Sequence, residues 1–577
     1  MNQQELADLF ERIADLLEIK GEVIYVTRAY RRAAESLRGL AEDIQVVHLE
    51  GRLTSIPGIG KAISEKIKEL LTTGRLTFLE KLEDEVPPSL LEVLQVPDVG
   101  PRKAALFWKQ AGIITREGLR QAALAGKLRN LPGMGEKSEA RILAGIAALE
   151  RMGGRHSLET AWKSAHIWLE WLRSLPSVQQ AQPAGSLRRW KETIGDLDLV
   201  VASNEPGQVM QAFTHHPDVL EVKGQGEYKA SVELRSGMRI QLWLQPPHRF
   251  GSLWQYATGS KHHNIRLREY AIQKGCSLSE RGILLANGEY HECETEEEVY
   301  HHLGMVWIPP ELREDRGEIQ AALENRLPAL IETQQRQAEL HCHTTWSDGI
   351  LSIEEMARFA RAKGIRLLAI TDHSAGLGVA GGLTVDRLRD QRAEINAVQQ
   401  KLGDTIQLIQ GAEVEIRSDG SLDYPNEVLA ELDIAIASLH SSLKQPREVV
   451  TQRLVNAINN PHIDLIGHPS GRLFPRREGA DLDWDTVLSA AVKNGVALEI
   501  NASPYRLDLN DIYARRAAEM GILLAVNTDA HSQLDFELVR YGISVARRAW
   551  LTAGQVINTW QPQRILSWLH SRNKNST

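Results

Sequence analysis

The sequence predicts a multidomain protein with helical modules at the N-terminus, an α+β region in the middle and a parallel α/β barrel at the C-terminus. Three observations carry this prediction. Helical segments punctuated by Gly and Pro repeat before residue 150, a strand-rich pattern follows, and short apolar strands alternate with helices from about residue 337. A chain of 577 residues also exceeds what one hydrophobic core usually holds.

The composition is that of an ordinary globular protein. Hydrophobic residues make up 42% of the chain, and no apolar run approaches the roughly 18 residues that a transmembrane helix needs. The first residues lack the basic start and apolar stretch of a signal peptide, so we expect a cytoplasmic protein without membrane contact. The formal net charge is −8, which argues against a generally basic surface, so any contact with nucleic acid must be local.

Three short segments in the first 150 residues resemble one another. They read Ile56-Pro-Gly-Ile-Gly-Lys, Val96-Pro-Asp-Val-Gly-Pro-Arg-Lys and Leu131-Pro-Gly-Met-Gly-Glu-Lys, with Asp98 replacing the first glycine of the second copy. A Gly-rich turn before a helix exposes N–H groups where the helix dipole favours an anion, so each segment predicts a helix-hairpin-helix turn that binds a DNA phosphate without reading bases. One copy alone would equally fit a plain turn. The predicted contact residues are Gly58, Gly60, Lys61, Gly100, Arg102, Lys103, Gly133, Gly135 and Lys137.

A second pattern occupies the middle of the chain. Gly185-Ser186-Leu-Arg188-Arg189 precedes Asp196-Leu-Asp198, which opens a predicted strand. Carboxylates two residues apart on a strand face one side, where they suit a pair of Mg²⁺ ions for nucleotidyl transfer. The hydroxyl and guanidinium groups before them suit a triphosphate. Taken alone, the pattern also fits a surface strand. Two more strands, over 231–234 and 238–244, flank a predicted hairpin turn at 235–237.

Nine side chains of the metal-binding type follow apolar strands in the last part of the chain. Because the carboxyl ends of parallel barrel strands meet on one face, we expect these side chains to converge there. Mixed imidazole and carboxylate ligation favours Zn²⁺ or Mn²⁺, and nine ligands suffice for up to three ions, which clamp a phosphate and activate water for phosphoester hydrolysis. Asp372 and Glu415 are expected to support the ligands by hydrogen bonds. The nine are His341, His343, Asp348, His373, Glu413, His440, His468, Asp529 and His531.

Together these motifs resemble the bacterial family X DNA polymerases, in which a polymerase-beta-like core is fused to a C-terminal polymerase-and-histidinol-phosphatase (PHP) domain. The resemblance covers nearly the whole chain and includes Tyr30-Arg-Arg-Ala-Ala, Tyr256-Ala-Thr-Gly-Ser-Lys-His-His-Asn and Pro310-Glu-Leu-Arg-Glu. It implies a nucleotidyltransferase palm, a distorted (β/α)7 PHP barrel and hairpins that often hold a monovalent cation. It also implies that an incoming dNTP would be held by Ser186, Arg189, Tyr256, Gly259, Asn264 and Arg268.

The resemblance also places the domain boundaries. Residues 1–85 would form a helical DNA-binding or lyase-like domain with the first hairpin, and 86–155 a helical domain with the other two. The palm would span 156–246, the nucleotide-selecting domain 247–315, a charged helical linker 316–336 and the PHP domain 337–577. Lys66 falls on the position of the family's deoxyribose-phosphate lyase lysine, although a lysine there, taken alone, is far more often a solvated helix residue.

One residue departs from the family pattern in the palm. Gln241 stands where the family has a third catalytic aspartate. An amide offers a single neutral oxygen and takes no proton, so we expect templated synthesis to be weak or lost unless Glu233 on the neighbouring strand substitutes. Ala257 replaces a bulky aromatic residue beside Tyr256, which is expected to loosen sugar selection.

The resemblance implies a DNA-repair enzyme that binds gapped or 3′-recessed DNA without sequence preference and trims the 3′ end in its barrel as a 3′-5′ exonuclease. The palm would serve as a platform for DNA and dNTP. Three alternatives stay open: a fully bifunctional polymerase and exonuclease, a small-molecule phosphatase, which the hairpins argue against, and a non-catalytic scaffold, which the full ligand set argues against. The candidate catalytic residues are Asp196, Asp198, Gln241, Lys66 and Asp372.

Overall fold

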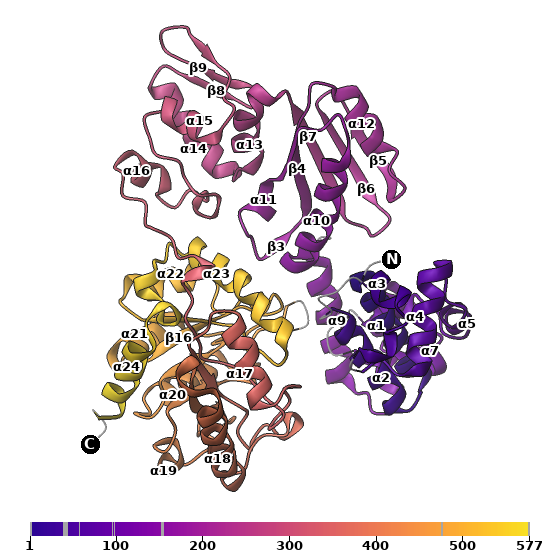
Figure 1. Cartoon of the computed structure of the whole chain (residues 1–577), viewed down its shortest axis with the longest axis vertical. Helices are drawn as coiled ribbons and strands as arrows, with labels where there is room; N and C mark the ends of the chain where they lie inside the picture. The colour runs from indigo at the N-terminus through magenta and orange to yellow at the C-terminus, as the bar shows by residue number, and fades with distance from the viewer. Residues whose placement is uncertain are drawn as a thin grey trace. The chain divides into compact units, whose positions relative to one another are not determined.

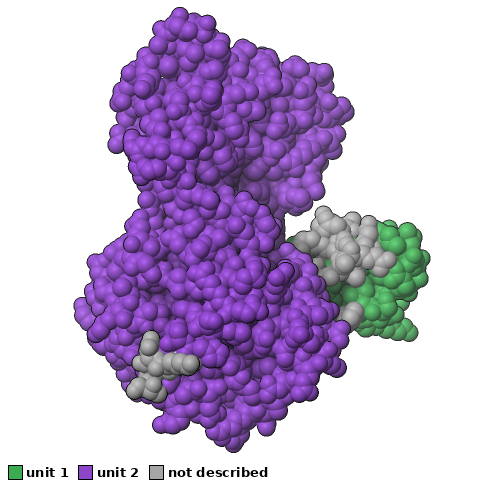
Figure 2. Space-filling model, turned by 60° about the vertical axis from the view of Figure 1, so that its left-hand side comes forward, with its two compact units in different colours: residues 1–152, 475–478 green, residues 153–474, 479–577 purple. Residues whose placement is uncertain are grey.

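The computed structural model describes residues 3–38, 44–56, 58–94, 96, 99–151, 155–474 and 477–574. The chain forms two compact units, coloured green and purple in Figure 2. The first holds residues 1–152 with 475–478, and the second holds 153–474 with 479–577. Within the described residues, no helix is both long and apolar enough to cross a membrane.

The first unit is helical throughout its described part, as the sequence predicts. Its core includes Tyr30, whose ring stacks between those of Phe10 and Phe78 at centroid distances of 5.8 and 5.9 Å. Such aromatic stacks join segments far apart in the sequence. The helices, indigo to purple in Figure 1, are α1 (Gln3–Lys20), α2 (Ile24–Arg38), α3 (Ile44–Leu49), α4 (Lys61–Thr73), α5 (Thr77–Glu85), α6 (Leu90–Leu94), α7 (Pro101–Ala111), α8 (Arg116–Leu124) and α9 (Glu136–Arg151).

The palm region of the second unit is a five-stranded sheet in the order β2-β4-β7-β6-β5. Apolar side chains alternate with polar ones, so Leu197, Leu199 and Leu242 are buried while Asp198 and Gln241 share the opposite face. Gly237 N donates to Leu234 O at 2.9 Å, which forms the predicted hairpin turn. The elements are α10 (Leu158–Ser174), β2 (Gln180–Pro183), α11 (Gly185–Arg188), β3 (Thr193–Ile194), β4 (Asp196–Ala202), α12 (Pro206–Thr214), β5 (Val219–Gln225), β6 (Lys229–Leu234) and β7 (Arg239–Gln245).

A buried ion cluster joins the palm to the next region. Glu296 is 2% exposed and accepts two hydrogen bonds from Arg188 of the palm and two from Arg313. Breaking a buried pair of this kind leaves an unpaired charge and costs roughly 3–5 kcal/mol. The region consists of α13 (Phe250–Thr258), α14 (Lys261–Gln273), β8 (Ser277–Ser279), β9 (Gly282–Leu284), β10 (Tyr290–His291) and α15 (Glu296–His302).

The segment expected to be a charged helical linker is instead packed into the second unit. Only α16 (Glu318–Leu323) is helical between residues 316 and 332. Arg313 and Glu318 are fully buried, and Glu318 Oε1 lies 2.7 Å from His263 Nδ1. Two charged residues of this stretch, Glu318 and Arg336, are therefore buried against other segments, whereas Glu324, Arg326 and Glu332 are exposed.

The C-terminal region is a parallel barrel of seven strands in chain order, which confirms the predicted fold class. A parallel bridge between Cys342 and Ala530 brings the first and last strands together. The strands are β11 (Ala338–Glu339), β12 (Leu367–Ile370), β13 (Gln407–Glu415), β14 (Ile434–Ser438), β15 (Leu465–Gly467), β16 (Ala497–Asn501) and β17 (Leu524–Asn527). The helices around them (Figure 1) are α17 (Ile353–Ala362), α18 (Val385–Leu402), α19 (Asn426–Leu429), α20 (Arg447–Ile458), α21 (Trp484–Asn494), α22 (Asp511–Glu519), α23 (Val539–Arg548) and α24 (Pro562–Lys574).

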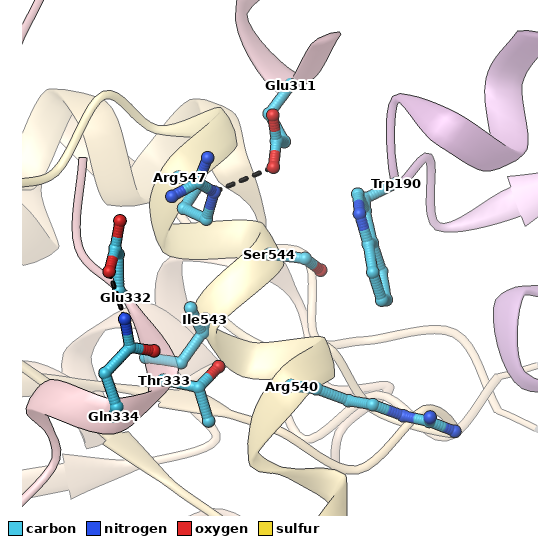
Figure 3. Close-up of a pocket in the computed structure, with 9 residues that line it drawn as sticks. All are labelled: Trp190, Glu311, Glu332, Thr333, Gln334, Arg540, Ile543, Ser544 and Arg547. Atoms are coloured by element: carbon cyan, nitrogen blue, oxygen red, sulfur yellow. Dashed lines mark hydrogen bonds and ion pairs between the residues drawn. The ribbon is translucent and has the colours of Figure 1, made fainter. Parts of the chain in front are cut away.

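The palm packs on the barrel through α23. Arg548 is buried and donates to Arg189 O at 2.7 Å, to Glu314 Oε1 at 3.0 Å and to Asp511 Oδ2 at 2.9 Å. A neighbouring pocket has a volume of about 340 Å³. Within it, Trp190 of the palm faces the helix α23 (Figure 3). The palm, the packed segment after it and the barrel therefore share one charged interface.

Candidate functional site

The nine predicted metal-type side chains converge at the carboxyl ends of the barrel strands. Glu413 lies at their centre, with its two oxygens between 2.8 and 3.6 Å from five imidazoles. His468 belongs to the cluster through its 2.8 Å contact with Glu413. Three overlapping groups bring their ligand atoms within 4.8 Å of one another: His343, Asp348, His373 and His531; His341, His343 and Asp529; and His373, Glu413 and His440.

Among the described residues, several buried polar atoms of this cluster have no hydrogen-bond partner. They include Nε2 of His341, both ring nitrogens of His343 and of His468, and both carboxylate oxygens of Glu413. Buried polar groups are nearly always hydrogen-bonded, so unsatisfied atoms gathered at one place need an explanation. Imidazole nitrogens and carboxylate oxygens aimed at a common centre fit divalent cations, because a cation satisfies all of them at once.

The pKa values of two histidines in the cluster indicate how the site would bind cations. Burial, together with the neighbouring His531, lowers the pKa of His343 to about 3, so the ring is neutral at neutral pH and one of its nitrogens offers a lone pair to a metal ion. Burial alone would lower the pKa of His373 as well, but Glu413 and Asp348 raise it to about 10. A metal ion entering the site must displace the proton of His373, because only neutral imidazole binds metal.

A residue that the sequence analysis did not identify supports the ligands from β16. Glu499 is fully buried and its Oε1 lies 2.8 Å from Nδ1 of His341, while its Oε2 accepts from His468 N at 2.7 Å. A carboxylate on the far nitrogen fixes the ring so that Nε2 points at the centre. The available sequence signal was one Glu inside the apolar strand Val496-Ala-Leu-Glu-Ile.

Glu415 and Asp372, the two carboxylates expected to support the ligands, have different hydrogen-bond partners. Glu415 Oε2 lies 2.7 Å from Nδ1 of His440, which is the supporting contact that the sequence predicts. Asp372, predicted among the catalytic residues, accepts bonds from Thr344 N and Oγ1, from Ser347 Oγ and from Gln391 Nε2 at 2.5 to 2.7 Å. Its lone pairs are occupied, so the geometry is that of a residue that fixes the loop before Asp348.

A positive charge that the sequence analysis also did not identify lies beside the ligands. The Nε atom of Arg506 is 3.6 Å from Asp529 Oδ2, and the arginine side chain is 13% exposed. It comes from the loop after β16, which carries none of the nine predicted ligands. A guanidinium at the edge of a metal-type cluster is placed to meet an anionic substrate.

A pocket of about 500 Å³ in the palm gathers the residues that the resemblance assigns to a dNTP. Gly185 has a positive φ of 57°, and a side chain there would meet the Asp198 carboxylate at 2.0 Å, so only glycine fits. Arg189 is already engaged with Glu314 at 3.1 Å and with Thr258 O. The predicted residues that line the pocket are Ser186, Arg189, Asp196, Asp198, Tyr256, Gly259, Asn264 and Arg268.

The carboxylates of this pocket have uncharged partners. Gln241 pairs with Asp198 in the strand register, and its Nε2 donates to Asp196 Oδ2. Burial and the nearby Asp196 raise the pKa of Asp198 to about 7. Glu233 does not substitute for the missing carboxylate, because it pairs with Arg239 in the strand register and lies 3.0 Å from Lys223.

The three predicted hairpins share one turn geometry. Residues 59, 99 and 134 each donate a backbone hydrogen bond of 3.0 Å to the residue three positions earlier. Gly60 and Gly100 cap α4 and α7, and Gly135 precedes α9. A side chain at any of these glycines would meet nothing within 4 Å, so the surface is open to a phosphate backbone. Asp98 lies outside the described residues.

Lys66 lies on α4 of the first unit, where its Nζ is 4.6 Å from the centroid of the Phe78 ring and 3.5 Å from Ala62 O. The lyase role that the resemblance implies for this lysine stays a prediction.

Comparison with known proteins covers the whole chain. Family models match at residues 1–76 (helix-hairpin-helix domain), 90–148 (SAM-like helix-hairpin-helix tandem), 253–314 (DNA polymerase beta thumb) and 339–503 (PHP domain). The DNA polymerase/3′-5′ exonuclease PolX of Bacillus subtilis (strain 168) is 37% identical over 561 residues, 97% of each chain. A probable phosphatase of Thermoanaerobacter sp. (strain X514) is 33% identical over 232 residues, which are 38% of this chain and 89% of the phosphatase.

Glu499→Gln is expected to lower the affinity of the barrel for Mn²⁺ about ten- to a hundredfold, because the amide cannot hold the His341 ring with a carboxylate's charge. Equilibrium titration of the metal-free protein with Mn²⁺ measures the effect. Glu427→Gln, an exposed change on the same barrel, is the control. Equal Mn²⁺ affinity of both variants would contradict the supporting role of Glu499.

Gly60→Asp combined with Gly135→Asp is expected to weaken DNA binding about tenfold, because each new carboxylate repels a phosphate at a helix start. Both sites have room for the side chain. Gly207→Asp, also at an open helix start but in the palm, is the control. Fluorescence anisotropy with two unrelated duplexes measures the affinity, and an unchanged affinity of the double variant would exclude the hairpins as phosphate contacts.

Proposed function

Because the chain belongs to the PolX family of DNA polymerase/3′-5′ exonucleases, and is thus a DNA-binding, metal-dependent enzyme, we propose that its barrel hydrolyses 3′-terminal phosphodiesters of DNA at a three-metal centre. The observation that supports the proposal best is the convergence of nine side chains around buried atoms that lack partners. The mixed imidazole and carboxylate set favours Mn²⁺ or Zn²⁺. The overlap of the three ligand groups, which share His343 and His373, supports closely spaced ions.

Bound divalent ions would clamp phosphate oxygens and make water nucleophilic near neutral pH. The chain itself supplies orientation and charge. Glu413 would be shared between ions, since it contacts imidazoles from all three ligand groups. Glu499 keeps the His341 ring turned toward the centre. The Arg506 guanidinium beside Asp529 is placed to donate to a non-bridging oxygen of the scissile phosphate.

We propose that the palm binds dNTP and Mg²⁺ but does not support efficient templated synthesis. Asp196 is held by the Gln241 amide, and burial raises the pKa of Asp198 to about 7, so this carboxyl is readily protonated near neutral pH. Two-metal nucleotidyl transfer needs charged ligands and a proton acceptor near the primer hydroxyl. The alternative is a fully bifunctional polymerase and exonuclease, which is what the name of the Bacillus subtilis relative says of that protein.

The hairpins of the first unit favour DNA over a small phosphoester as the substrate. Three open turns that each end at a helix start provide phosphate contacts without base contacts, which suits gapped or 3′-recessed DNA of any sequence. Monovalent cations at these turns and a lyase reaction at Lys66 remain predictions from the family resemblance. A small-molecule phosphatase would need neither the hairpins nor the palm.

The wild-type protein with Mn²⁺ is expected to shorten a labelled 3′-recessed primer, and added dNTPs should not reverse the shortening. Asp529→Ala with His531→Ala should slow the shortening by at least about a hundredfold, because ligands of two groups are lost. EDTA should have the same effect. Shortening that survives the double variant would exclude the barrel as the nuclease.

Gln241→Asp is expected to raise primer extension about a hundredfold in Mg²⁺, because it restores a charged ligand and proton acceptor. Gln245→Asp, on the same strand but far from the two aspartates in the register, is the control. Single-nucleotide insertion measured in the Asp529→Ala, His531→Ala background removes degradation from the assay. Robust extension by the unaltered palm would favour the bifunctional alternative.

A further inference from the structure

A glutamate of the palm reaches the barrel near its metal-type ligands. Glu192 lies between α11 and β3, and its two carboxylate oxygens accept from the Arg472 guanidinium at 2.9 and 3.2 Å. Arg472 follows the ligand His468 by four positions (472 − 468 = 4) in the loop after β15. The ion pair therefore joins the palm to the end of the barrel that carries the ligands.

Arg472 extends this contact to the loop after β16. Its Nε donates to Arg506 O at 2.5 Å, and its Nη2 donates to Leu507 O. The same two loops meet again where Ser470 N and Oγ donate to Asp508 Oδ2 at 3.0 and 2.9 Å. The backbone that carries Arg506 is therefore held at three consecutive residues by the loop after β15.

The held loop presents its guanidinium to a ligand. Arg506 Nε lies 3.6 Å from Asp529 Oδ2, and Arg506 Nη1 lies 3.5 Å from Arg472 O. An unbroken series of contacts thus runs from Glu192 through Arg472 to Arg506 and Asp529. Burial alone would lower the pKa of Arg472, but Glu192 and Asp508 raise it above its usual value, so the guanidinium stays charged.

We propose that Glu192 is a positioning residue for the barrel's phosphoester site. By holding Arg472 with two bonds, it fixes the orientation of the loop at 506–508 and so the place of the Arg506 guanidinium at the substrate phosphate. A carboxylate that accepts two hydrogen bonds from one guanidinium restrains the orientation of the guanidinium as well as its distance. A single point charge would not restrain the orientation. The inference rests on the proposed function of the barrel, and it makes the nuclease site dependent on the polymerase-like part of the chain.

The test compares full-length Glu192→Gln with the wild type, both loaded with Mn²⁺. Calorimetric titration with inorganic phosphate should show a Kd about tenfold higher in the variant, the size expected when a charge-assisted contact to phosphate is loosened. The KM for a single-stranded oligonucleotide should rise by a similar factor, while kcat, bound Mn²⁺ and Tm stay near the wild-type values. Glu221→Gln, which removes an exposed palm carboxylate paired with Lys223, is the control.

Two further variants separate positioning from general damage. Glu192→Asp keeps the charge and should recover most of the phosphate affinity. Arg472→Gln should weaken phosphate binding at least as much as Glu192→Gln, and combining the two should add nothing, because both act through one contact. An unchanged phosphate Kd in Glu192→Gln, an equal change in Glu221→Gln or a parallel loss of Mn²⁺ would overturn the inference. A wild type that binds phosphate in a Glu192-dependent way without shortening DNA would uphold it and overturn the proposed exonuclease.

Discussion

The concentration of negative charge at one end of the barrel is the constraint on which the rest of the structure depends. Glu413 is buried, Asp529 is nearly so and Asp348 lies at the exposed edge, and six imidazoles lie within 4 Å of these three carboxylates. Buried carboxylates cost several kcal/mol each unless cations compensate them. The parallel barrel brings the charges together because its strands end on one face, and the carboxylates behind the ligands, such as Glu499, hold the imidazoles in place.

In the palm, the charges of the two neighbouring carboxylates Asp196 and Asp198 are compensated in a different way from those in the barrel. There, burial and mutual repulsion push Asp198 toward its protonated form, and an amide rather than a third carboxylate faces Asp196. Arg189 of the pocket is engaged as well, because it donates to Glu314 and to Thr258 O. On our proposal, this site keeps the shape of a nucleotide pocket but has less of the charge that metal-assisted transfer requires.

The two parts of the second unit are connected by charged contacts rather than by a flexible linker. Arg548 of the barrel binds the backbone of Arg189, and Glu192 of the palm binds Arg472 of the barrel. Such bidentate and buried contacts have defined directions, so they transmit the position of one part to the other. The segment at 189–192 therefore touches both the nucleotide pocket and the barrel's ligand loops.

The sequence by itself determined the fold class, the helix-hairpin-helix modules and the nine metal-type side chains that the barrel brings together, because periodicity, glycine placement and residue type are local properties of the chain. It did not identify Glu499, Arg506 or Glu192, since each is one ordinary charged residue whose partner lies far away in the chain. It also interpreted 316–336 as a charged helical linker, because the sequence does not reveal whether a charged residue such as Glu318 faces water or a buried partner. Only the tertiary structure decided those pairings, because they depend on which strand ends and loops the barrel and the palm bring within hydrogen-bond distance.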